Sequence, residues 1–536
     1  MFSNFKKHNK TSAMKKLLLF IGFIISQNAS AQLILQWQAN FGGSAVESMT
    51  NSEIGTSNIL KTNDGGFILA GNSFSNDGNV TGHHGTTSRN DFWVVKLDSL
   101  RNIQWERSLG GTNEDQANKI IQTSDSGFIL IGFSDSFDGD ITSFHGSRDI
   151  WVVKLDFSGN IQWQKNYGGT YSEVGTDIIE ITGGFIFCGT TGSNDGDVTN
   201  LHGNPPTSDF WVVKISIQGG ILWQKTFGGS NLDYASSITK AANNTYIIGG
   251  TSNSNNGDVT GNHGNYDYWI IKIDSIGNLL WQKSFGGSSG EQLNAICNSL
   301  DGNHLISGYS ASLNGDITGH HGNTANDYWV VKFNSSGNLI WQKSLGGTDD
   351  DVAYGLSSTN DNGTLVIGGS RSIDGNVYDH IDAGFPSENF WITKLDSAGN
   401  IDWSKSLAAD SSGNAKGISG IQISTSCYVF AGNAGGVNFS QDYWIIKLCD
   451  NLTTVTGNNL INSINIYPNP TTDRIYFNYQ SSELYLELSN ISGALLLSKK
   501  INTPFPEINL QNYSEGVYFL TIYSKEGVSR KIIVKQ

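Results

Sequence analysis

The sequence is poor in charged residues and in proline, and it contains few cysteines and methionines. Only 15% of the 536 residues are Asp, Glu, Lys or Arg, and there are 7 prolines, 4 cysteines and 3 methionines. Four cysteines in a chain of this length do not make a disulfide-stapled scaffold. A hydrophobic content of 38% with 11% aromatic residues excludes a disordered chain, and the length allows more than one domain.

Positive charge is also scarce, and the formal net charge is −15. This excess of acid argues against nucleic acid as a partner, because binding to a phosphate backbone requires a basic face. The abundant residues are glycine, with 64 copies, together with Asn, Ser and Thr. This composition favours a turn-rich all-β protein over a helical one.

The sequence has no apolar run long enough to span a membrane, which needs roughly 20 residues. A short run of nine apolar residues, Leu17–Ile25, follows Met14-Lys15-Lys16 and precedes Ala29-Ser30-Ala31. A basic start, a short apolar segment and an A-x-A exit are typical of a secretory signal peptide. We therefore expect residues 1–31 to be such a signal, with Met14 as the true start, and the mature chain to be exported without a transmembrane segment.

Two tryptophan phrases recur along the chain and divide it into seven repeats. The first resembles DFWVVKLD and the second NIQWQKSxGG, and their spacing is usually 58 to 62 residues. All 14 tryptophans belong to one phrase or the other. The first set is Trp93, Trp151, Trp211, Trp269, Trp329, Trp391 and Trp444, and the second is Trp37, Trp105, Trp163, Trp223, Trp281, Trp341 and Trp403. Because both sets recur in every repeat, we expect these side chains to pack between repeats rather than to bind carbohydrate.

Each repeat reads as four short strands. In the second repeat these are Ile103–Leu109, Ala117–Gln122, Gly127–Gly132 and Asp149–Leu155. The first alternates apolar and polar residues, as a half-exposed strand does, whereas the last two are apolar on both faces and are expected to be covered on both. Gly and Asn in the connections favour tight turns.

Seven four-stranded repeats of about 60 residues predict an all-β fold, a seven-bladed β-propeller over residues 32–450. We letter the strands of a blade a to d from the central channel outwards. The chain begins with a lone d strand, Leu33–Phe41, and the last repeat ends at Cys449 without one. The N-terminal strand is therefore expected to complete the last blade and close the ring.

The repeat resembles bacterial secreted β-propeller units of the form DGGFIxxG…DxWVxKLDxxGNxxWxxxxGG. Here the matching residues are Asp64–Phe67, Trp93–Asp98, Trp105 and Gly110-Gly111. The resemblance covers about residues 33 to 450 and implies the fold. It implies little about function, because propellers serve in binding, scaffolding and catalysis alike.

A second domain follows a polar linker, residues 451–463. Its short strands predict a small Ig-like β-sandwich over residues 464–536. It closely resembles the type A C-terminal sorting domain of the Bacteroidetes type IX secretion system, and the residues that carry the sorting signal in this resemblance are Tyr467, Pro468, Asn469, Pro470, Gly516 and Tyr518. The resemblance implies the type IX machinery as a partner, passage through the periplasm and across the outer membrane, and a secreted or cell-surface location. The other interpretation is an ordinary appended β-domain.

An acidic residue follows the second glycine of a GG pair by four positions in six repeats. These candidate ligand-binding residues are Glu47, Asp115, Glu173, Asp233, Glu291 and Asp351. Strand a of a propeller lines the channel, so the six carboxylates could ring its mouth and attract a cation or a polyhydroxylated ligand. The alternative is that each acid binds backbone N–H groups of its own loop or of the next blade's loop.

The long loop between strands b and c repeats an Asx-Gly-Asx segment, often followed by a His-Gly pair. The carboxylates of this segment are Asp77, Asp138, Asp140, Asp195, Asp197, Asp258, Asp316 and Asp374. One interpretation is a calcium site, because hard cations prefer clustered oxygen ligands, and calcium is the one cofactor that the sequence suggests. The other is an Asx turn that closes the loop with its own side chain.

The four cysteines fall into two classes. Cys188 and Cys297 lie within predicted strands, where a free cysteine behaves as a small core residue. Cys427 begins strand b of the last repeat and Cys449 ends its strand c, so the two positions face each other in an antiparallel pair. In an oxidising export route they are candidates for a disulfide.

No repeat carries a unique combination of nucleophile, base and oxyanion donor, as a catalytic site requires. We therefore expect an exported, non-catalytic binding or adhesion propeller whose partner is a glycan or a surface protein. The alternatives are a secreted polysaccharide-degrading enzyme, with paired carboxylates from the acidic ring, and a structural surface or matrix protein. The loop Ser44–Ser57 and the insertions at Pro205-Pro206 and Asp379–Glu388 are the most asymmetric places and the expected source of specificity.

Overall fold

The computed structural model describes most of the chain as β-strands arranged in two compact units, Met1–Cys449 and Asp450–Gln536. The described residues are 33–49, 58–205, 207–381, 387–408, 414–435, 441–450, 466–477, 484–490, 495–501, 507–524 and 527–536. The expected signal peptide and linker lie outside them. Within these ranges the one helical element is a 3₁₀ turn, Ala242–Asn244, and no helix has the length and apolar character to cross a membrane.

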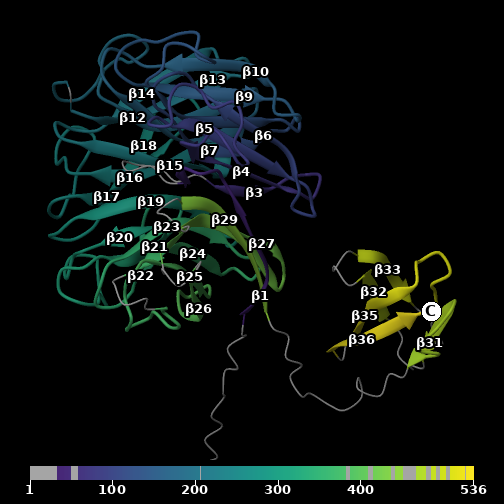
Figure 1. The fold of residues 1–536 in the computed structure, drawn as a ribbon. Coiled ribbons are helices and arrows are strands. Elements are labelled where there is room, and N and C mark those ends of the chain that lie inside the picture. Colours follow the sequence, from purple (N-terminus) through teal and green to yellow (C-terminus); the bar gives the residue numbers. More distant parts are fainter. Residues whose placement is uncertain are drawn as a thin grey trace, which may run out of the picture. The chain divides into compact units, whose positions relative to one another are not determined.

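The first unit consists of antiparallel sheets of four strands, with one additional short strand in the first sheet (Figure 1). We number these sheets I to VII in chain order. Sheets I and II comprise β2 (Glu47–Ser48), β3 (Ile59–Lys61), β4 (Phe67–Ser73), β5 (Asp91–Leu97) and β6 (Ile103–Leu109), then β7 (Asp115–Gln122), β8 (Phe128–Ser134), β9 (Asp149–Leu155) and β10 (Ile161–Tyr167). Sheets III and IV comprise β11 (Glu173–Ile181), β12 (Gly184–Thr191), β13 (Asp209–Ser216) and β14 (Ile221–Phe227), then β15 (Asp233–Ala241), β16 (Thr245–Ser252), β17 (Asp267–Ile273) and β18 (Leu279–Phe285).

The last three sheets repeat this order and differ only at the chain's return to its start. Sheets V and VI comprise β19 (Glu291–Asn298), β20 (His304–Ser310), β21 (Asp327–Phe333) and β22 (Leu339–Leu345), then β23 (Asp351–Ser358), β24 (Thr364–Ser370), β25 (Asn389–Leu395) and β26 (Ile401–Leu407). Sheet VII comprises β27 (Ala415–Ser424), β28 (Cys427–Gly435), β29 (Gln441–Asp450) and β1 (Leu33–Phe41). These sheets have the strand number and order of propeller blades.

The N-terminal strand β1 pairs with β29, at the other end of the unit, as the sequence predicts. The Nε1 of Trp444 on β29 donates a hydrogen bond to Oε1 of Gln38 on β1, over 3.2 Å. In sheets II to V the same tryptophan position donates to a glutamine of strand d, as Trp151 does to Gln164 over 2.9 Å. β1 therefore takes the place of a strand d, and the free edge of β29 is covered.

Aromatic side chains of strand c connect neighbouring sheets. The strand-c tryptophans are 0 to 3% exposed. In most sheets the residue before the tryptophan is a Phe or Tyr whose ring contacts the tryptophan of the next sheet, as Tyr268 does with Trp329 at a centroid distance of 4.5 Å. The same contact joins the last sheet to the first, because the ring of Tyr443 lies 4.7 Å from that of Trp93 and its hydroxyl donates to the Trp93 carbonyl oxygen. The chain of contacts between sheets thus returns to its start.

The lysine of strand c is buried in several sheets and is paired there. Nζ of Lys96, which is fully buried, lies 2.8 Å from Oδ2 of Asp64 in the turn between strands a and b. Lys154, Lys332 and Lys394 make the same pair with the acid of their own a–b turn. A buried ammonium group requires a partner of opposite charge. The acid supplies it, and the ion pair thereby ties the a–b turn to strand c.

The second unit has two sheets around one core. Their strands are β30 (Ile466–Tyr467), β31 (Arg474–Phe477) and β34 (Glu507–Asn509), then β33 (Leu495–Ile501), β32 (Leu484–Asn490), β35 (Gly516–Ser524) and β36 (Gly527–Lys535). Residues of both sheets share the core, among them Ile475, Leu488 and Leu520. Asn469 connects the opening segment to the last strand, since its Nδ2 donates to the Ile532 carbonyl oxygen and its Oδ1 accepts from Val534 N–H. Tyr467 is half exposed, whereas Tyr518 is buried.

In sheet VII a disulfide joins Cys427 and Cys449, which are direct partners in the register of β28 and β29. Removing it with the double substitution Cys427→Ser and Cys449→Ser is expected to lower the free energy of unfolding by about 2 to 4 kcal/mol, because the unfolded chain gains entropy. Urea denaturation followed by tryptophan fluorescence measures this. A reductant should lower the midpoint of the native protein and leave that of the double variant unchanged; an equal response of the two would contradict the prediction.

Candidate functional site

The six acids that follow the GG pairs are buried, with 0 or 1% of each residue exposed. In sheet II, Oδ2 of Asp115 accepts hydrogen bonds from Gly111 N–H, over 2.7 Å, and from the Ser136 hydroxyl, over 2.9 Å. Glu47, Glu173, Asp233, Glu291 and Asp351 each accept from the corresponding glycine N–H and from a Ser or Thr hydroxyl. The structure therefore does not bring these carboxylates to a solvent-facing ring. It shows the alternative arrangement, in which each acid binds the backbone of its own loop.

Burial also controls the protonation of these acids. Desolvation raises the pKa of Asp115, Glu173 and Asp351 to about 7 and that of Asp233 to about 6, although hydrogen bonds from glycine N–H and hydroxyl groups act in the opposite direction. The pKa values of Glu47 and Glu291 are raised for the same reason. Because burial raises these pKa values, the acids favour the folded state most at a pH low enough to keep them protonated.

A second buried acid begins strand c and binds the histidine of the preceding loop. Oδ2 of Asp91 accepts hydrogen bonds from the backbone N–H of His84 and from its Nδ1, both over 2.8 Å. The same pair recurs at His145 with Asp149, His202 with Asp209, His263 with Asp267 and His321 with Asp327. The hydrogen bond that the His84 side chain makes to Asp91 raises the pKa of His84. The His-Gly pairs therefore close the b–c loop onto its own strand.

The Asx-Gly-Asx segments bind the GG loop rather than one another. Oδ1 of Asp138 accepts from Thr112 N–H over 2.8 Å, and Oδ2 of Asp140 accepts from Gly110 N–H over 3.1 Å. All eight carboxylates considered for calcium accept such a bond: Asp77, Asp138, Asp140, Asp195, Asp197, Asp258, Asp316 and Asp374. Within the described ranges, no group of three or more His, Cys, Asp or Glu residues is placed to hold a metal ion. This geometry is that of loop closure by the Asx side chains, the second of the two interpretations of the segment.

The GG pair is required by close packing. A Cβ on Gly110 would lie 2.6 Å from Oδ2 of Asp115 and 2.9 Å from Oδ1 of Asp91, and corresponding contacts surround the first glycine of the other pairs. A side chain at this position would displace one of the two buried carboxylates. The loop, the two acids and the Asx-Gly-Asx segment thus form one structural element at the six sheet boundaries that carry a GG pair.

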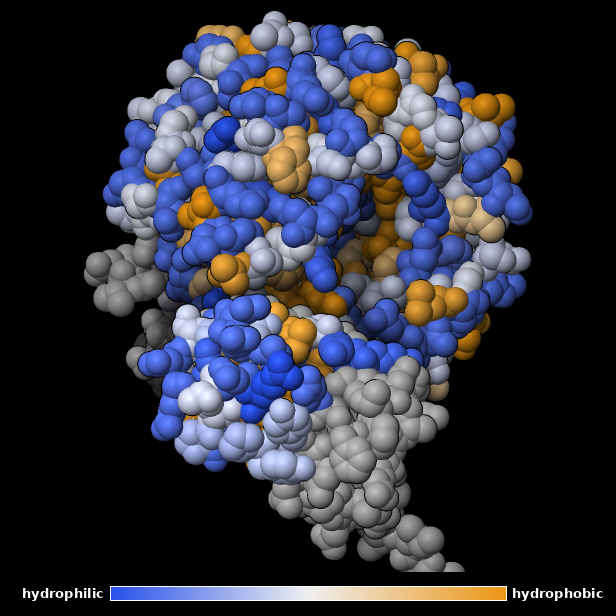
Figure 2. Space-filling view, turned by 90° about the vertical axis from the view of Figure 1, so that its right-hand side faces the viewer, coloured by the Kyte–Doolittle hydropathy of each residue, from blue (hydrophilic) through white to orange (hydrophobic). Residues whose placement is uncertain are grey.

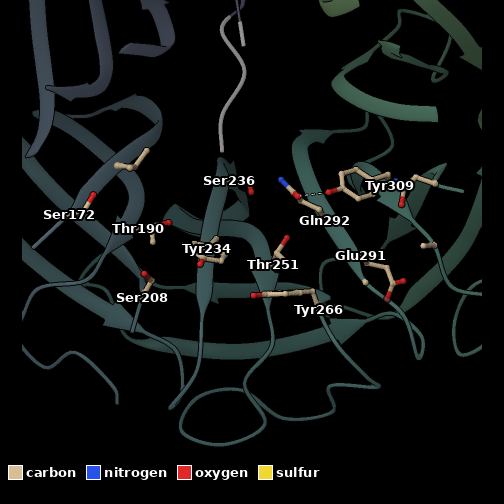
Figure 3. A pocket seen from close by; sticks show the side chains of 14 residues that line it. Ser172, Thr190, Ser208, Tyr234, Ser236, Thr251, Tyr266, Glu291, Gln292 and Tyr309 are labelled. Atoms are coloured by element: carbon tan, nitrogen blue, oxygen red, sulfur yellow. Dashed lines mark hydrogen bonds between the residues drawn. The ribbon is translucent and has the colours of Figure 1, made fainter. Parts of the chain in front are cut away.

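The candidate binding site is a cavity of about 730 Å³ in the first unit, between sheets III, IV and V (Figure 3). Its lining residues are Ser172, Val174, Thr190, Ser208, Tyr234, Ser236, Thr251, Tyr266, Gly290, Glu291, Gln292, Tyr309, Ala311 and Asn326. Within it the Tyr309 hydroxyl donates to Oε1 of Gln292 over 2.6 Å. Burial raises the pKa of Tyr309, so its phenol stays protonated at neutral pH. Figure 2 shows, for one face, a hollow in a largely hydrophilic surface with hydrophobic residues gathered on its inner wall.

The chemistry of the cavity comes from positions that vary between repeats. One is the residue after the strand-a acid, which is Gln116, Val174, Tyr234, Gln292 and Val352 in sheets II to VI. Another is its register partner on strand b, which is Phe133, Thr190, Thr251, Tyr309 and Gly369. A third precedes the strand-c acid and is Asn90, Arg148, Ser208, Tyr266 and Asn326 in sheets I to V.

Sequence reasoning missed these residues because it considered the repeated acids and the loop insertions. The signal was present as variation beside an invariant position, with tyrosines confined to single repeats. None of the lining residues belongs to the insertions expected to give specificity, of which residues 50–57, 206 and 382–386 lie outside the described ranges.

The raised pKa values predict that the free energy of unfolding falls as pH rises from about 4 to about 7. In this window the folded state binds more protons than the unfolded state, in which an aspartate has a pKa near 3.8. Asp115→Asn is expected to reduce this fall by up to one proton, or about 1.4 kcal/mol per pH unit. Urea denaturation at several pH values measures the slope. Asp98→Asn is a control, because hydrogen bonds from Asn102 hold the pKa of Asp98 below its usual range. Equal slopes for Asp115→Asn and the native protein would refute the prediction.

The chain has distant similarities to other proteins, each over part of its length. An uncharacterized WD repeat-containing protein of Acanthamoeba polyphaga mimivirus is 22% identical over 327 residues, and the match covers 46% of this chain and 23% of that protein. The chain therefore matches less than a quarter of the length of this relative. Among solved structures, the polysaccharide lyase Uly1 has a TM-score of 0.45 at 11% identity, covering 78% of this chain and 99% of that one.

Two further structures come from bacteria. A protein of unknown function from Dyadobacter fermentans has a TM-score of 0.40 at 9% identity and covers 78% of this chain and 99% of its own. PorZ, a surface component of the type IX secretion system of Porphyromonas gingivalis, has a TM-score of 0.28 at 10% identity, covering 90% of this chain and 70% of that one. Similarities at this level assign no function to the cavity.

The second unit, by contrast, has a defined family. Residues 465–535 match the family model of the Secretion system C-terminal sorting domain. This range contains the strands β30 to β36 and the sorting-signal residues from Tyr467 to Tyr518. The C-terminal unit is thus a type IX sorting domain, handled by the type IX secretion machinery, and it indicates that the chain is exported to the cell surface or secreted.

Proposed function

We propose that the first unit is a closed seven-bladed β-propeller and that the exported chain is a non-catalytic binding protein whose ligand enters the cavity between sheets III, IV and V. The return of the aromatic contacts from Tyr443 to Trp93 and the pairing of β1 with β29 support a closed ring. The second unit, with two sheets on one core, is proposed to be an Ig-like sandwich.

The observation that carries the binding role is the composition of the cavity. Its wall combines three tyrosines with amide and hydroxyl groups, and a site of about 730 Å³ lies in the usual size range of ligand pockets. These groups lie beside a scaffold that every repeat shares, so the site is asymmetric although the fold is repetitive. A purely structural matrix protein would not require such a difference between repeats.

The enzymatic alternative requires a pair of carboxylates on either side of the scissile bond. Among the described residues that line the cavity, Glu291 is the one carboxylate, and it is 1% exposed. Its Oε2 accepts from Gly287 N–H over 2.8 Å and its Oε1 accepts from the Ser310 hydroxyl over 2.9 Å. Both oxygens thus have structural partners, which favours binding over hydrolysis.

A panel of immobilised surface polymers tests this proposal. The full chain is applied to neutral and acidic polysaccharides, peptidoglycan and extracellular-matrix proteins, and retention and released reducing sugar are measured. We expect retention on at least one polymer without release of reducing sugar. We expect Tyr234→Ala to reduce that retention at least tenfold, because it removes a half-buried aromatic ring from the wall of the cavity.

Tyr378→Ala is the matched control, because this tyrosine is 58% exposed and does not line the cavity. It should leave retention unchanged. Retention that Tyr234→Ala and Tyr378→Ala leave equally intact would remove the cavity from the proposal. Release of product that depends on Glu291 would establish the enzymatic alternative instead.

A further inference from the structure

We infer that the ligand of this cavity is an uncharged polyhydroxylated chain, a neutral oligosaccharide rather than an acidic one. This inference rests on the proposed binding function and specifies the ligand class of the same site. Three features of the wall support it: the charge of its groups, the aromatic surface and the arrangement of one hydrogen-bonded pair.

The charge of the wall excludes strong recognition of an ion. No Lys, Arg or His is among the described lining residues, so a uronate or sulfate group would find no cationic partner there. The one carboxylate, Glu291, is held by its own loop and by Ser310, so a cationic ligand would find no available anion. The protein as a whole carries a formal charge of −15, which further disfavours an anion. An uncharged ligand avoids the cost of burying an unpaired charge.

The tyrosines provide surface that suits a sugar ring. Tyr234 and Tyr266 come from sheet IV, the first from strand a and the second from the residue before strand c, and both are half buried. Both line the cavity together with Thr251, which is the register partner of Tyr234 on strand b (Figure 3). Tyrosine combines an apolar ring with a polar tip, and a pyranose combines apolar C–H faces with hydroxyl edges. The apolar ring can therefore pack against the C–H face of the sugar while the tyrosine hydroxyl meets its hydroxyl edge.

The pair of Tyr309 and Gln292 gives the wall both hydrogen-bond donors and acceptors. Oε1 of Gln292 accepts from the Tyr309 hydroxyl, and the amide NH2 group is then available to other acceptors. In Figure 3 the amide nitrogen lies on the side of the side chain away from Tyr309. The phenol oxygen keeps its acceptor capacity while the amide presents donors. A sugar hydroxyl, which donates and accepts, can use both groups at once.

Calorimetric titration of the full chain with defined oligosaccharides tests the inference. The probes are cellohexaose, mannohexaose and laminarihexaose as neutral chains and hexagalacturonate as the acidic chain, each at low and high sodium chloride. We expect at least one neutral hexamer to bind, with an affinity that changes less than about twofold with salt, because no ion pair forms. Hexagalacturonate should bind at least tenfold more weakly.

The substitution Tyr309→Phe removes one hydroxyl and releases the Gln292 amide, and it is expected to weaken neutral binding about five- to tenfold, the effect of one hydrogen bond. Tyr328→Phe is the matched control. Its hydroxyl is buried between sheets V and VI and donates to the Trp391 carbonyl oxygen, outside the cavity. We expect this variant to be less stable and to bind unchanged. The thermal midpoints of both variants show whether each one is folded.

The outcomes separate the ligand class from the binding function. Tighter, salt-sensitive binding of hexagalacturonate overturns the inference, as does neutral binding that is unaffected by Tyr309→Phe and Tyr234→Ala. If no hexamer binds while a polymer or protein is still retained through Tyr234, the ligand class is wrong and the binding function stands. If the cavity variants change no interaction in either experiment, both proposals fail.

Discussion

The structure of the first unit depends on a buried carboxylate that binds the backbone of the GG loop. The loop connects the outer strand of one sheet to the inner strand of the next, and its N–H groups would otherwise be buried without partners. Asp115 supplies such a partner, because its Oδ2 accepts hydrogen bonds from Gly111 N–H and from the Ser136 hydroxyl. A buried unsatisfied N–H costs about as much as a lost hydrogen bond, so every boundary that lacks solvent requires such an acceptor.

This arrangement explains several other features of the repeat. The first glycine must lack a side chain, because Asp91 and Asp115 approach it from two sides. The histidine of the b–c loop holds Asp91, and the Asx-Gly-Asx segment binds the remaining N–H groups of the GG loop. Acidic residues are thus used as internal acceptors rather than as surface charge, and the raised pKa values of Asp115, Glu173 and Asp351 are a consequence of that use.

The repeated elements leave a small set of positions free to vary. Val174, Tyr234 and Gln292 each follow a strand-a acid, and all three line the cavity. Tyr234 and Gln292 occupy the same position in adjacent repeats and differ completely in chemistry. A repetitive scaffold can therefore hold an asymmetric site, because side chains next to the repeated acids differ between repeats.

The sequence by itself determined the all-β fold, the repeat boundaries, the pairing of β1 with β29 and the sorting domain, because each follows from local patterns that recur or match a motif. It also placed Cys427 opposite Cys449. Only the tertiary structure decided what the acids do. A carboxylate four residues after a glycine pair has the same sequence whether it faces solvent or the backbone, and burial distinguishes the two. The same holds for the cavity. Tyr234, Tyr266 and Tyr309 lie up to 75 residues apart in the chain, and they line one cavity because sheets IV and V pack side by side.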